Sequence, residues 1–364
     1  MRSSSEVDRR AAATLTAMKM VLIDRPGGYR HLRLESAPDP PPGPGELLIG
    51  VQASGVNFAD CLTRMGYYSS ARHYRGYPLT PGFEVAGRVL ALGPGVSSHA
   101  VGDPVLALTL FNGYASRLVA RPGYVFPLPE GWTPLQGAGF PTVFLTAWFA
   151  LFELAHPHPG DCLLVHSAAG GVGSALVQLG RLAGCRVVGV VGSSHKVDAV
   201  RHLGADAVID KSRESLWMAA ERLAPEGYQV VLDANGPSTL GQSYRHLAPA
   251  GKLVVYGFHD MFPRSRGVPN RVRLWLDYVR TPRFNPFQLT NRNRSVMGFN
   301  LSYLFDRTDL LATAMGQLLG WVAEGRVQPL PVTGYPLEQV AEAHRALESG
   351  MTVGKLVLTM EEPA

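Results

Sequence analysis

Hydrophobic residues follow two different patterns along the chain. From about Met18 to Pro129 they form short β-like runs broken by glycine and proline, such as LLIGVQASGV (47–56) and DPVLALTL (103–110). Short strands with frequent turns are typical of an all-β, barrel-like domain.

From about Thr142, strand-like runs alternate with helical ones. We predict strands at 162–168, 185–192, 207–210, 228–236, 252–258 and 295–301, and helices at 172–183, 196–203, 215–223 and 238–247. Continuous Val, Leu and Ile strands with crossover helices indicate a parallel sheet covered on both faces. The predicted fold class is therefore α/β, with a doubly wound Rossmann sheet that binds a dinucleotide.

The same pattern predicts the domain boundaries. Residues 1–17 are expected to be a disordered tail, and 142–301 the Rossmann domain. Residues 18–141 and 302–364 are expected to form the other domain, because a strand–helix–strand tail at 327–360 should pack back on the first strands. A chain of 364 residues is long enough for two domains.

A glycine motif follows the first predicted Rossmann strand. Residues 168–173, AAGGVG, fit GxGxxG with Ala168 at the first glycine. Gly170 would let the backbone approach a pyrophosphate, and Gly173 would let the helix pack closely on the strand. Gly171 and Val172 would open a helix whose free N–H groups face the phosphates. The alternative is a glycine turn that serves packing alone.

The end of the second predicted strand indicates which cofactor is bound. An acidic residue there would mark NAD, but the sequence reads GSSHK (192–196), and no acid occurs before Asp198. Ser193 and Lys196 could hold a 2′-phosphate, so we predict NADPH. The alternative is an exposed helix start with serine as its N-cap.

Three motifs occur together in order: GVNFAD…R.G.Y (55–68), PG.E..G.V (81–89) and AAGGVG (168–173). In this the chain resembles the medium-chain dehydrogenase/reductase superfamily, and in particular its zinc-free quinone oxidoreductase branch, which includes zeta-crystallin. The stretch NRSVMGFNL (293–301) looks most like the vesicle amine transport protein subgroup. The resemblance implies a GroES-like β-barrel catalytic domain split around the Rossmann domain, with a cleft between them.

The resemblance also implies that no metal is bound. The zinc alcohol dehydrogenases place Cys where Asn57 stands and His where Phe83 stands, and Phe cannot bind zinc. Cys61, Cys162 and Cys185 are too few for the second, four-cysteine site. They also form no disulfide framework, so we expect a cytoplasmic protein.

The resemblance implies two catalytic candidates. Asn57 would lie near the nicotinamide ribose and the substrate, and Tyr68 would line the cleft, where a phenol can donate a proton or hydrogen bond to an enolate. The structural alternatives are a turn asparagine and a half-buried loop tyrosine. Asp60 and Arg64 of the same motif are interpreted as an ion pair within one helical turn, and Glu84 as a residue that shapes the barrel.

Other residues are expected to line the nicotinamide pocket, where the domains meet or where the fourth and fifth strands end. These residues are Thr142, Thr146, Asn235, Tyr256, Gly257 and Phe258. Thr146 could equally be a buried helix residue. The roles of Lys211 and Lys355 stay open.

Charge adds one feature. The net charge of +5 is spread along the chain and does not indicate nucleic-acid binding. The segment 259–294 interrupts the Rossmann pattern, and 264–294 holds eight arginines and one acid, Asp277. This segment has three possible interpretations: a lid that binds a phosphorylated or acidic substrate carrier, a membrane-surface patch, or a solvated loop. We favour the solvated loop.

These observations lead to a functional hypothesis. We expect an NADPH-dependent oxidoreductase that reduces a conjugated carbonyl, a quinone or enone, by hydride transfer without zinc. The alternatives are a 2-enoyl-thioester reductase acting on a CoA- or carrier-bound substrate, and a non-enzymatic NADPH-binding structural or vesicle-associated protein. Relatives pair the sixth strand across a two-fold axis, so a homodimer is expected, with no nucleic-acid partner and no membrane span.

Overall fold

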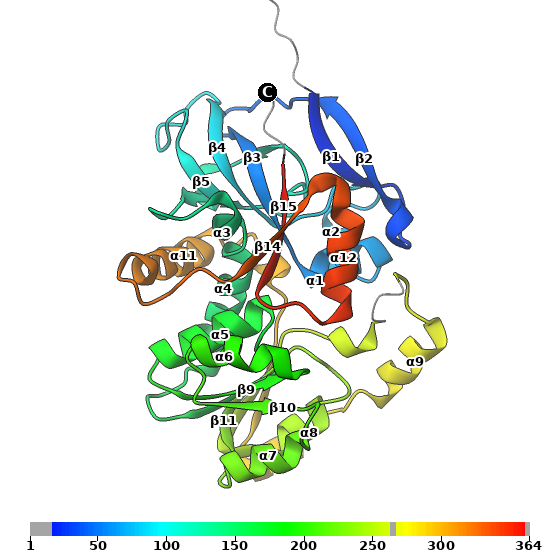
Figure 1. The fold of residues 1–364 in the computed structure, drawn as a ribbon, viewed down its shortest axis with the longest axis vertical. Helices are drawn as coiled ribbons and strands as arrows, with labels where there is room; N and C mark the ends of the chain where they lie inside the picture. Colours follow the sequence, from blue (N-terminus) through cyan, green and yellow to red (C-terminus); the bar gives the residue numbers. More distant parts are fainter. Residues whose placement is uncertain (1–16, 263–266, 361–364) are drawn as a thin grey trace, which may run out of the picture.

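The computed structural model describes residues 17–262 and 267–360 (Figure 1). The predicted tail, 1–17, lies outside these residues except for Ala17, which begins the first strand. Two lobes are stacked along the long axis, with the β-rich lobe at one end and the Rossmann lobe at the other.

The Rossmann lobe contains a six-stranded parallel sheet in the order β10-β9-β8-β11-β12-β13. Its strands are β8 (Cys162–Val165), β9 (Arg186–Val191), β10 (Ala207–Asp210), β11 (Tyr228–Asp233), β12 (Leu247–Val255) and β13 (Ser295–Gly298). Its crossover helices are α5 (Gly171–Leu182), α6 (Val197–His202), α7 (Leu216–Leu223) and α8 (Leu240–Arg245). The prediction of a doubly wound sheet is confirmed. The strand order reverses between β8 and β11, and β13 forms one edge of the sheet.

The other lobe is built on a seven-stranded sheet in the order β14-β15-β3-β4-β5-β7, with β6 also paired to β3. Its strands are β3 (Leu47–Val56), β4 (Glu84–Leu92), β5 (Pro104–Leu108), β6 (Arg117–Ala120), β7 (Val125–Pro127), β14 (Val332–Pro336) and β15 (Lys355–Thr359). A hairpin of β1 (Ala17–Ile23) and β2 (Leu32–Pro38) lies beside it. The C-terminal tail does pack back as predicted, because β15 pairs antiparallel with β3.

The remaining helices surround this sheet or join the lobes. They are α1 (Phe58–Met65), α2 (Ser69–Tyr74), α3 (Pro134–Ala138), α4 (Pro141–Trp148), α11 (Thr308–Ala323) and α12 (Val340–Ser349), with a π-helical turn at Phe149–Ala155. The apolar helix α4 is almost wholly buried, and its Phe144 belongs to one core cluster with Leu106 of β5 and Leu163 of β8. This shared core holds the two lobes against each other. None of the helices in the described parts of the chain is long and apolar enough to cross a membrane.

The segment 259–294 differs from the favoured prediction of a solvated loop. It contains a short 3₁₀ turn, η5 (His259–Met261), and two helices, α9 (Arg271–Arg280) and α10 (Pro286–Arg292). Each helix has an asparagine N-cap: Asn270 Oδ1 accepts the Val272 N–H at 2.9 Å, and Asn285 Oδ1 accepts the Phe287 N–H at 2.9 Å. These caps satisfy donors that a helix start otherwise leaves free, and so they stabilise the starts of α9 and α10.

Candidate active site

The glycine motif forms the turn between β8 and α5. A Cβ on Gly173 would overlap the Ser167 carbonyl oxygen and lie 2.8 Å from Ala168 Cα, so only glycine lets α5 start this close to the strand. A Cβ on Gly170 would meet nothing nearer than 3.4 Å. Close packing therefore requires Gly173, whereas Gly170 borders open space at the N-terminus of α5, where a phosphate group would be favoured.

A cavity of about 1020 Å³ opens beside this turn, between the lobes and at the carboxyl ends of β8, β9, β11 and β12. Every residue predicted for the site lines it. They are Asn57, Tyr68, Thr142, Thr146, Gly170, Gly171, Val172, Gly173, Ser193, Lys196, Asn235, Tyr256, Gly257 and Phe258. Their placement agrees with the expected cleft, and their individual roles stay predictions.

Two polar atoms in the cavity wall have no hydrogen-bond partner among the described residues. They are the hydroxyl oxygens of Thr142 and Tyr256, both buried. A buried hydroxyl without a partner is costly, so a ligand with polar atoms fits this wall. Thr146 differs, because its hydroxyl donates to the Thr142 carbonyl at 2.7 Å within α4, as expected of a buried helix residue.

The far end of the cavity is the expected 2′-phosphate site. Lys196 is buried and donates from Nζ to the Gly350 carbonyl at 2.5 Å, which links it to the end of α12. Lys211 is exposed, and its Cε would lie 3.7 Å from a Cβ on Gly192, beside Ser193. Two lysines and Ser193 therefore border the same end, and Lys211 is the more accessible of the two lysines.

One carboxylate lies near this end without facing the cavity. Asp210 accepts hydrogen bonds from the hydroxyls of Ser194 and Ser212, both at 2.6 Å, and these bonds lower the pKa of its carboxyl. Asp210 is not among the cavity-lining residues. Its oxygens are thus engaged by the two serines.

A buried polar cluster lies at the opposite end of the cavity. Asn57 donates from Nδ2 to Glu84 Oε1 at 2.9 Å and accepts from Lys355 Nζ at 2.5 Å. Lys355 Nζ also lies 2.7 Å from Glu84 Oε1, and Glu84 Oε2 accepts the Thr142 backbone N–H at 2.7 Å. The cluster joins β15, β4 and the starts of α1 and α4, and it fixes both polar atoms of Asn57.

Strand register explains how these residues meet. Leu356 pairs with Val56 in the antiparallel β15–β3 ladder, which brings Lys355 opposite Asn57. A Cβ on Gly55 would overlap the Glu84 carboxylate, so glycine leaves the space through which Glu84 reaches the other two residues. The expectation that Glu84 shapes the barrel was incomplete, because Glu84 also binds Asn57 and Lys355. The role of Lys355 was left open, and the structure shows that Lys355 lines the cavity.

Tyr68 spans the cavity from the barrel side. Its hydroxyl donates to Asn300 Oδ1, just after β13, at 2.9 Å. Its ring packs edge-on against Phe83, 5.7 Å between centroids. Burial raises the pKa of the Tyr68 phenol to about 12, so the hydroxyl stays protonated at neutral pH. Phe83 in turn contacts Phe111, so the zinc-ligand position is part of an apolar cluster.

The predicted ion pair between Asp60 and Arg64 is wrong. Asp60 instead accepts the backbone N–H groups of Asn57 and Gly82, each at 2.8 Å, and so caps α1. Arg64 forms a buried ion pair with Glu348 of α12. The structural role was anticipated, but the partner lies 284 residues away and is not detectable from helical spacing.

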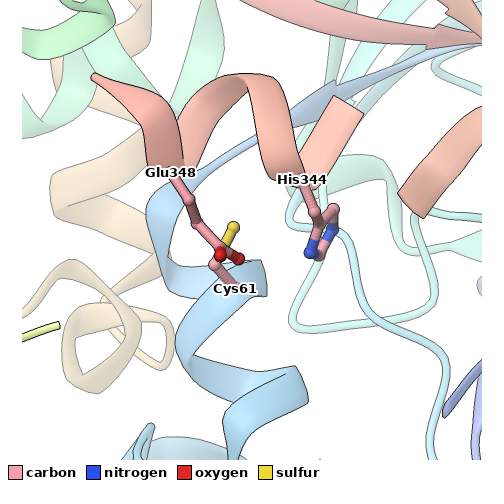
Figure 2. Close-up of side chains that lie close together, drawn as sticks. All are labelled: Cys61, His344 and Glu348. Carbon is pink, nitrogen blue, oxygen red and sulfur yellow. The ribbon is translucent and has the colours of Figure 1, made fainter. Parts of the chain in front are cut away.

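Beside that ion pair, Cys61 of α1 faces His344 and Glu348 of α12 (Figure 2). These three are the one group among the described residues whose ligand atoms lie close enough to hold a metal ion. Both Glu348 oxygens are already engaged, one by Arg64 and one by the Tyr29 hydroxyl at 2.5 Å. Burial raises the pKa of the Cys61 thiol, which disfavours the thiolate that a metal needs. The group is thus a helix–helix contact.

Comparison with known proteins identifies the family. The model of the alcohol dehydrogenase GroES-like domain matches residues 43–129, and that of the zinc-binding dehydrogenases matches residues 203–358. Human synaptic vesicle membrane protein VAT-1 homolog is 33% identical over 335 residues, which are 91% of this chain and 84% of that protein. The chain belongs to the medium-chain dehydrogenase/reductase superfamily. Within this superfamily it lies in the VAT-1-like branch.

Solved members of the superfamily share the whole fold. They include a Pseudomonas syringae quinone oxidoreductase (27% identical, TM-score 0.81), the CurK enoyl reductase (28%, 0.81) and a mycobacterial protein solved with NADPH (29%, 0.80). Each covers 94% of this chain over 99% of its own. The predicted superfamily and its GroES-like and Rossmann architecture are confirmed, and the NADPH-bound relative supports the predicted cofactor.

Proposed function

We propose that this medium-chain oxidoreductase uses NADPH to reduce a conjugated carbonyl, a quinone or an enone. The observation that carries the proposal is the single cavity in which the glycine turn, the two lysines at the 2′-phosphate end and the Asn57–Glu84–Lys355 cluster come together. Gly170 and the N-terminus of α5 would receive the pyrophosphate, and the free hydroxyls of Thr142 and Tyr256 would receive polar atoms of the nicotinamide half.

NADPH supplies the hydride when it is bound, and the chain supplies position and charge. The Lys355 ammonium has three N–H donors, and Asn57 and Glu84 take two of them. The third is available to a negative oxygen in the cavity, where a charged donor held in place by buried partners stabilises developing charge.

Tyr68 provides a neutral donor on the same side. Asn300 Oδ1, which accepts the hydrogen bond of the Tyr68 hydroxyl, also accepts hydrogen bonds from the backbone N–H and the hydroxyl of Ser302 at 3.1 and 2.9 Å. Asn300 therefore stays satisfied if the Tyr68 hydroxyl turns to a substrate oxygen. This makes Tyr68 a hydrogen-bond donor to an enolate or hydroquinone anion, with water as the proton source.

The side chains around the reacting region explain the preference for conjugated acceptors. Phe83 carries no ligand atom, and both polar atoms of Asn57 are bound to Glu84 and Lys355. Hydrogen bonds stabilise delocalised negative charge more readily, whereas a localised alkoxide gains more from a Lewis acid. Simple alcohols should accordingly be poor substrates.

The proposal includes the molecule's assembly and location. One side of edge strand β13 pairs with no other strand in the described parts of the chain; such an edge is costly to leave bare, and this supports a homodimer. The three cysteines are free and buried, which supports a reducing compartment, the cytoplasm. Light scattering at micromolar concentration tests the assembly, and a monomer there would count against it.

A 2-enoyl thioester is the second candidate substrate, favoured by the similarity to the CurK enoyl reductase. The two are separated by turnover of purified protein with NADPH against quinones, free enones and enoyl-CoA esters. Faster reduction of quinones or free enones supports the proposal. A requirement for the CoA handle favours the second candidate, and tight NADPH binding without turnover favours a non-enzymatic role.

A further inference from the structure

A buried carboxylate lies directly behind the cofactor cavity. Asp233 ends β11, is fully buried and is not among the residues that line the cavity. Its Oδ1 accepts the backbone N–H groups of Asn235 and Gly236 at 2.8 and 3.3 Å and the Thr239 hydroxyl at 3.0 Å. Its Oδ2 accepts the Ser243 hydroxyl at 2.8 Å. These donors satisfy a carboxylate that would otherwise be costly to bury.

The same carboxylate links β11 to β8, the two strands between which the strand order reverses. Ser243 Oγ lies 3.0 Å from Nε2 of His166, the residue that follows β8. Because the Ser243 hydrogen is used on Asp233, this bond requires the proton of His166 on Nε2. Ligands of doubly wound sheets bind where the strand order reverses. The network therefore fixes the ends of these two strands against each other beside the cofactor site.

The turn that follows Asp233 forms one wall of the cavity. Asn235 lines the cavity, and so does Ser167 beside the glycine turn. Asn235 Oδ1 accepts the Ser167 hydroxyl at 2.9 Å, and the Asn235 NH2 group donates to no residue in the described parts of the chain. That NH2 group is available to a polar atom of the nicotinamide half of NADPH.

A second wall of the cavity rests on the same turn. The backbone N–H groups of Tyr256, His259 and Asp260 donate to the carbonyls of residues 233–235 at 3.1, 3.1 and 2.9 Å. All three of these donors belong to residues that line the cavity. A shift of the turn would therefore move both walls together.

We infer that Asp233, Thr239 and Ser243 are positioning residues for the nicotinamide half of the NADPH site. None of the three lines the cavity, so each acts through the turn that it holds and not through contact with the cofactor. None of their hydrogen bonds involves Ser193 or Lys211 at the predicted 2′-phosphate end. The inference concerns NADPH binding and does not depend on which carbonyl is reduced.

The binding of two nucleotides tests the inference. Asp233→Asn keeps the shape, but its NH2 group must face one of the donors, and its oxygen is a weaker acceptor than a carboxylate. Thr239→Val keeps the size and removes one hydrogen bond. The turn is then held less firmly, and NADPH has to order it on binding. In fluorescence titrations we expect NADPH affinity to fall roughly tenfold in Asp233→Asn and about threefold in Thr239→Val. The affinity for 2′,5′-ADP, which lacks the nicotinamide half, should stay within about twofold of wild type.

Two control variants separate positioning from a general loss of stability. Thr239→Ser keeps the hydroxyl and should bind NADPH within about twofold of wild type. Tyr228→Phe removes a buried hydroxyl at the other end of β11, where it donates to the Ala220 carbonyl at 2.9 Å, and should lower the Tm without changing either affinity. In hydrogen exchange without nucleotide, the amides of residues 235 and 236 should exchange faster in Asp233→Asn than in Tyr228→Phe.

Three results would overturn the inference. The first is wild-type NADPH affinity in Thr239→Val and in Asp233→Asn; if Asp233→Asn does not fold, Thr239→Val compared with Thr239→Ser decides. The second is an equal loss of NADPH and 2′,5′-ADP binding, which would indicate general loosening of the domain. The third is the same loss of NADPH binding in Tyr228→Phe. No carbonyl substrate is used in these measurements, so their failure is distinct from a failure of the proposed reduction.

Discussion

Replacing Glu84 by glutamine tests the buried Asn57–Glu84–Lys355 cluster, which lies at the end of the cavity opposite the predicted 2′-phosphate site. The buried Glu84 carboxylate accepts from Asn57 and Thr142 and pairs with Lys355, which is 3% exposed. Glutamine keeps the shape, but one oxygen becomes an NH2 group. That group must face another donor, and the Lys355 ammonium is left buried without its counter-charge.

The expected cost follows from the burial. Removing one partner of a buried ion pair costs about 3–5 kcal/mol. Because Lys355 keeps its bond to Asn57, we expect the lower end, about 3 kcal/mol, for Glu84→Gln. At about 2 °C per kcal/mol for a large chain, the Tm should fall by roughly 6 °C. NADPH binding should weaken as well, because Thr142 and Lys355 line the cavity.

Urea unfolding followed by circular dichroism measures the effect, with two controls. Glu342→Gln removes an exposed ion pair with Arg345 and should change the free energy of unfolding by less than about 0.5 kcal/mol. Lys355→Met should cost less in the Glu84→Gln background than in wild type, since the two residues interact. Glu84→Gln protein as stable as the Glu342→Gln control, or strictly additive costs, would refute the reasoning.

Three further predictions concern the cofactor end and the buried contacts. Gly173→Ala should lose about 1–3 kcal/mol of stability by overpacking. Gly170→Ala should unfold like wild type but bind NADPH about tenfold more weakly in fluorescence titrations. The reverse pattern would contradict the assignment of Gly173 to packing and of Gly170 to the pyrophosphate. Lys211→Met should weaken NADPH binding by about tenfold and leave NADH binding unchanged, and an equal loss for both cofactors would exclude a 2′-phosphate contact. Burial lowers the pKa of His344 from 6.5 to about 3, so on acidification the unfolded chain takes up a proton before the folded protein does. The free energy of unfolding should therefore decrease below about pH 6.5, by at most about 1.4 kcal/mol per pH unit. His344→Gln should make this pH dependence less steep, and an unchanged pH dependence would show that His344 is not its source.

The parts of the site that sequence could predict are local. The glycine turn at 168–173 and the aromatic at position 83 each depend on a few consecutive residues, and the structure places the turn between β8 and α5 as expected. The sixth predicted strand is also present, as β13 at the edge of the sheet.

The parts that sequence missed depend on contacts between distant segments. Glu84 and Lys355 are 271 residues apart and meet only because β15 pairs with β3. Glu348, and not Asp60, is the partner of Arg64, because α12 packs against α1. The helix α9 was missed differently, because its apolar stripe has helical spacing but eight arginines in the surrounding 264–294 made a loop look more plausible.

A comparison of two rates tests most directly whether the cavity reduces conjugated carbonyls. Purified protein is assayed with NADPH against a panel of quinones and enones, and in the reverse direction with NADP and simple saturated alcohols. We expect measurable reduction of at least one conjugated acceptor, slowed in Lys355→Met and Tyr68→Phe, and alcohol oxidation far slower than that. Oxidation of simple alcohols faster than the reduction of every quinone and enone would contradict the proposed function.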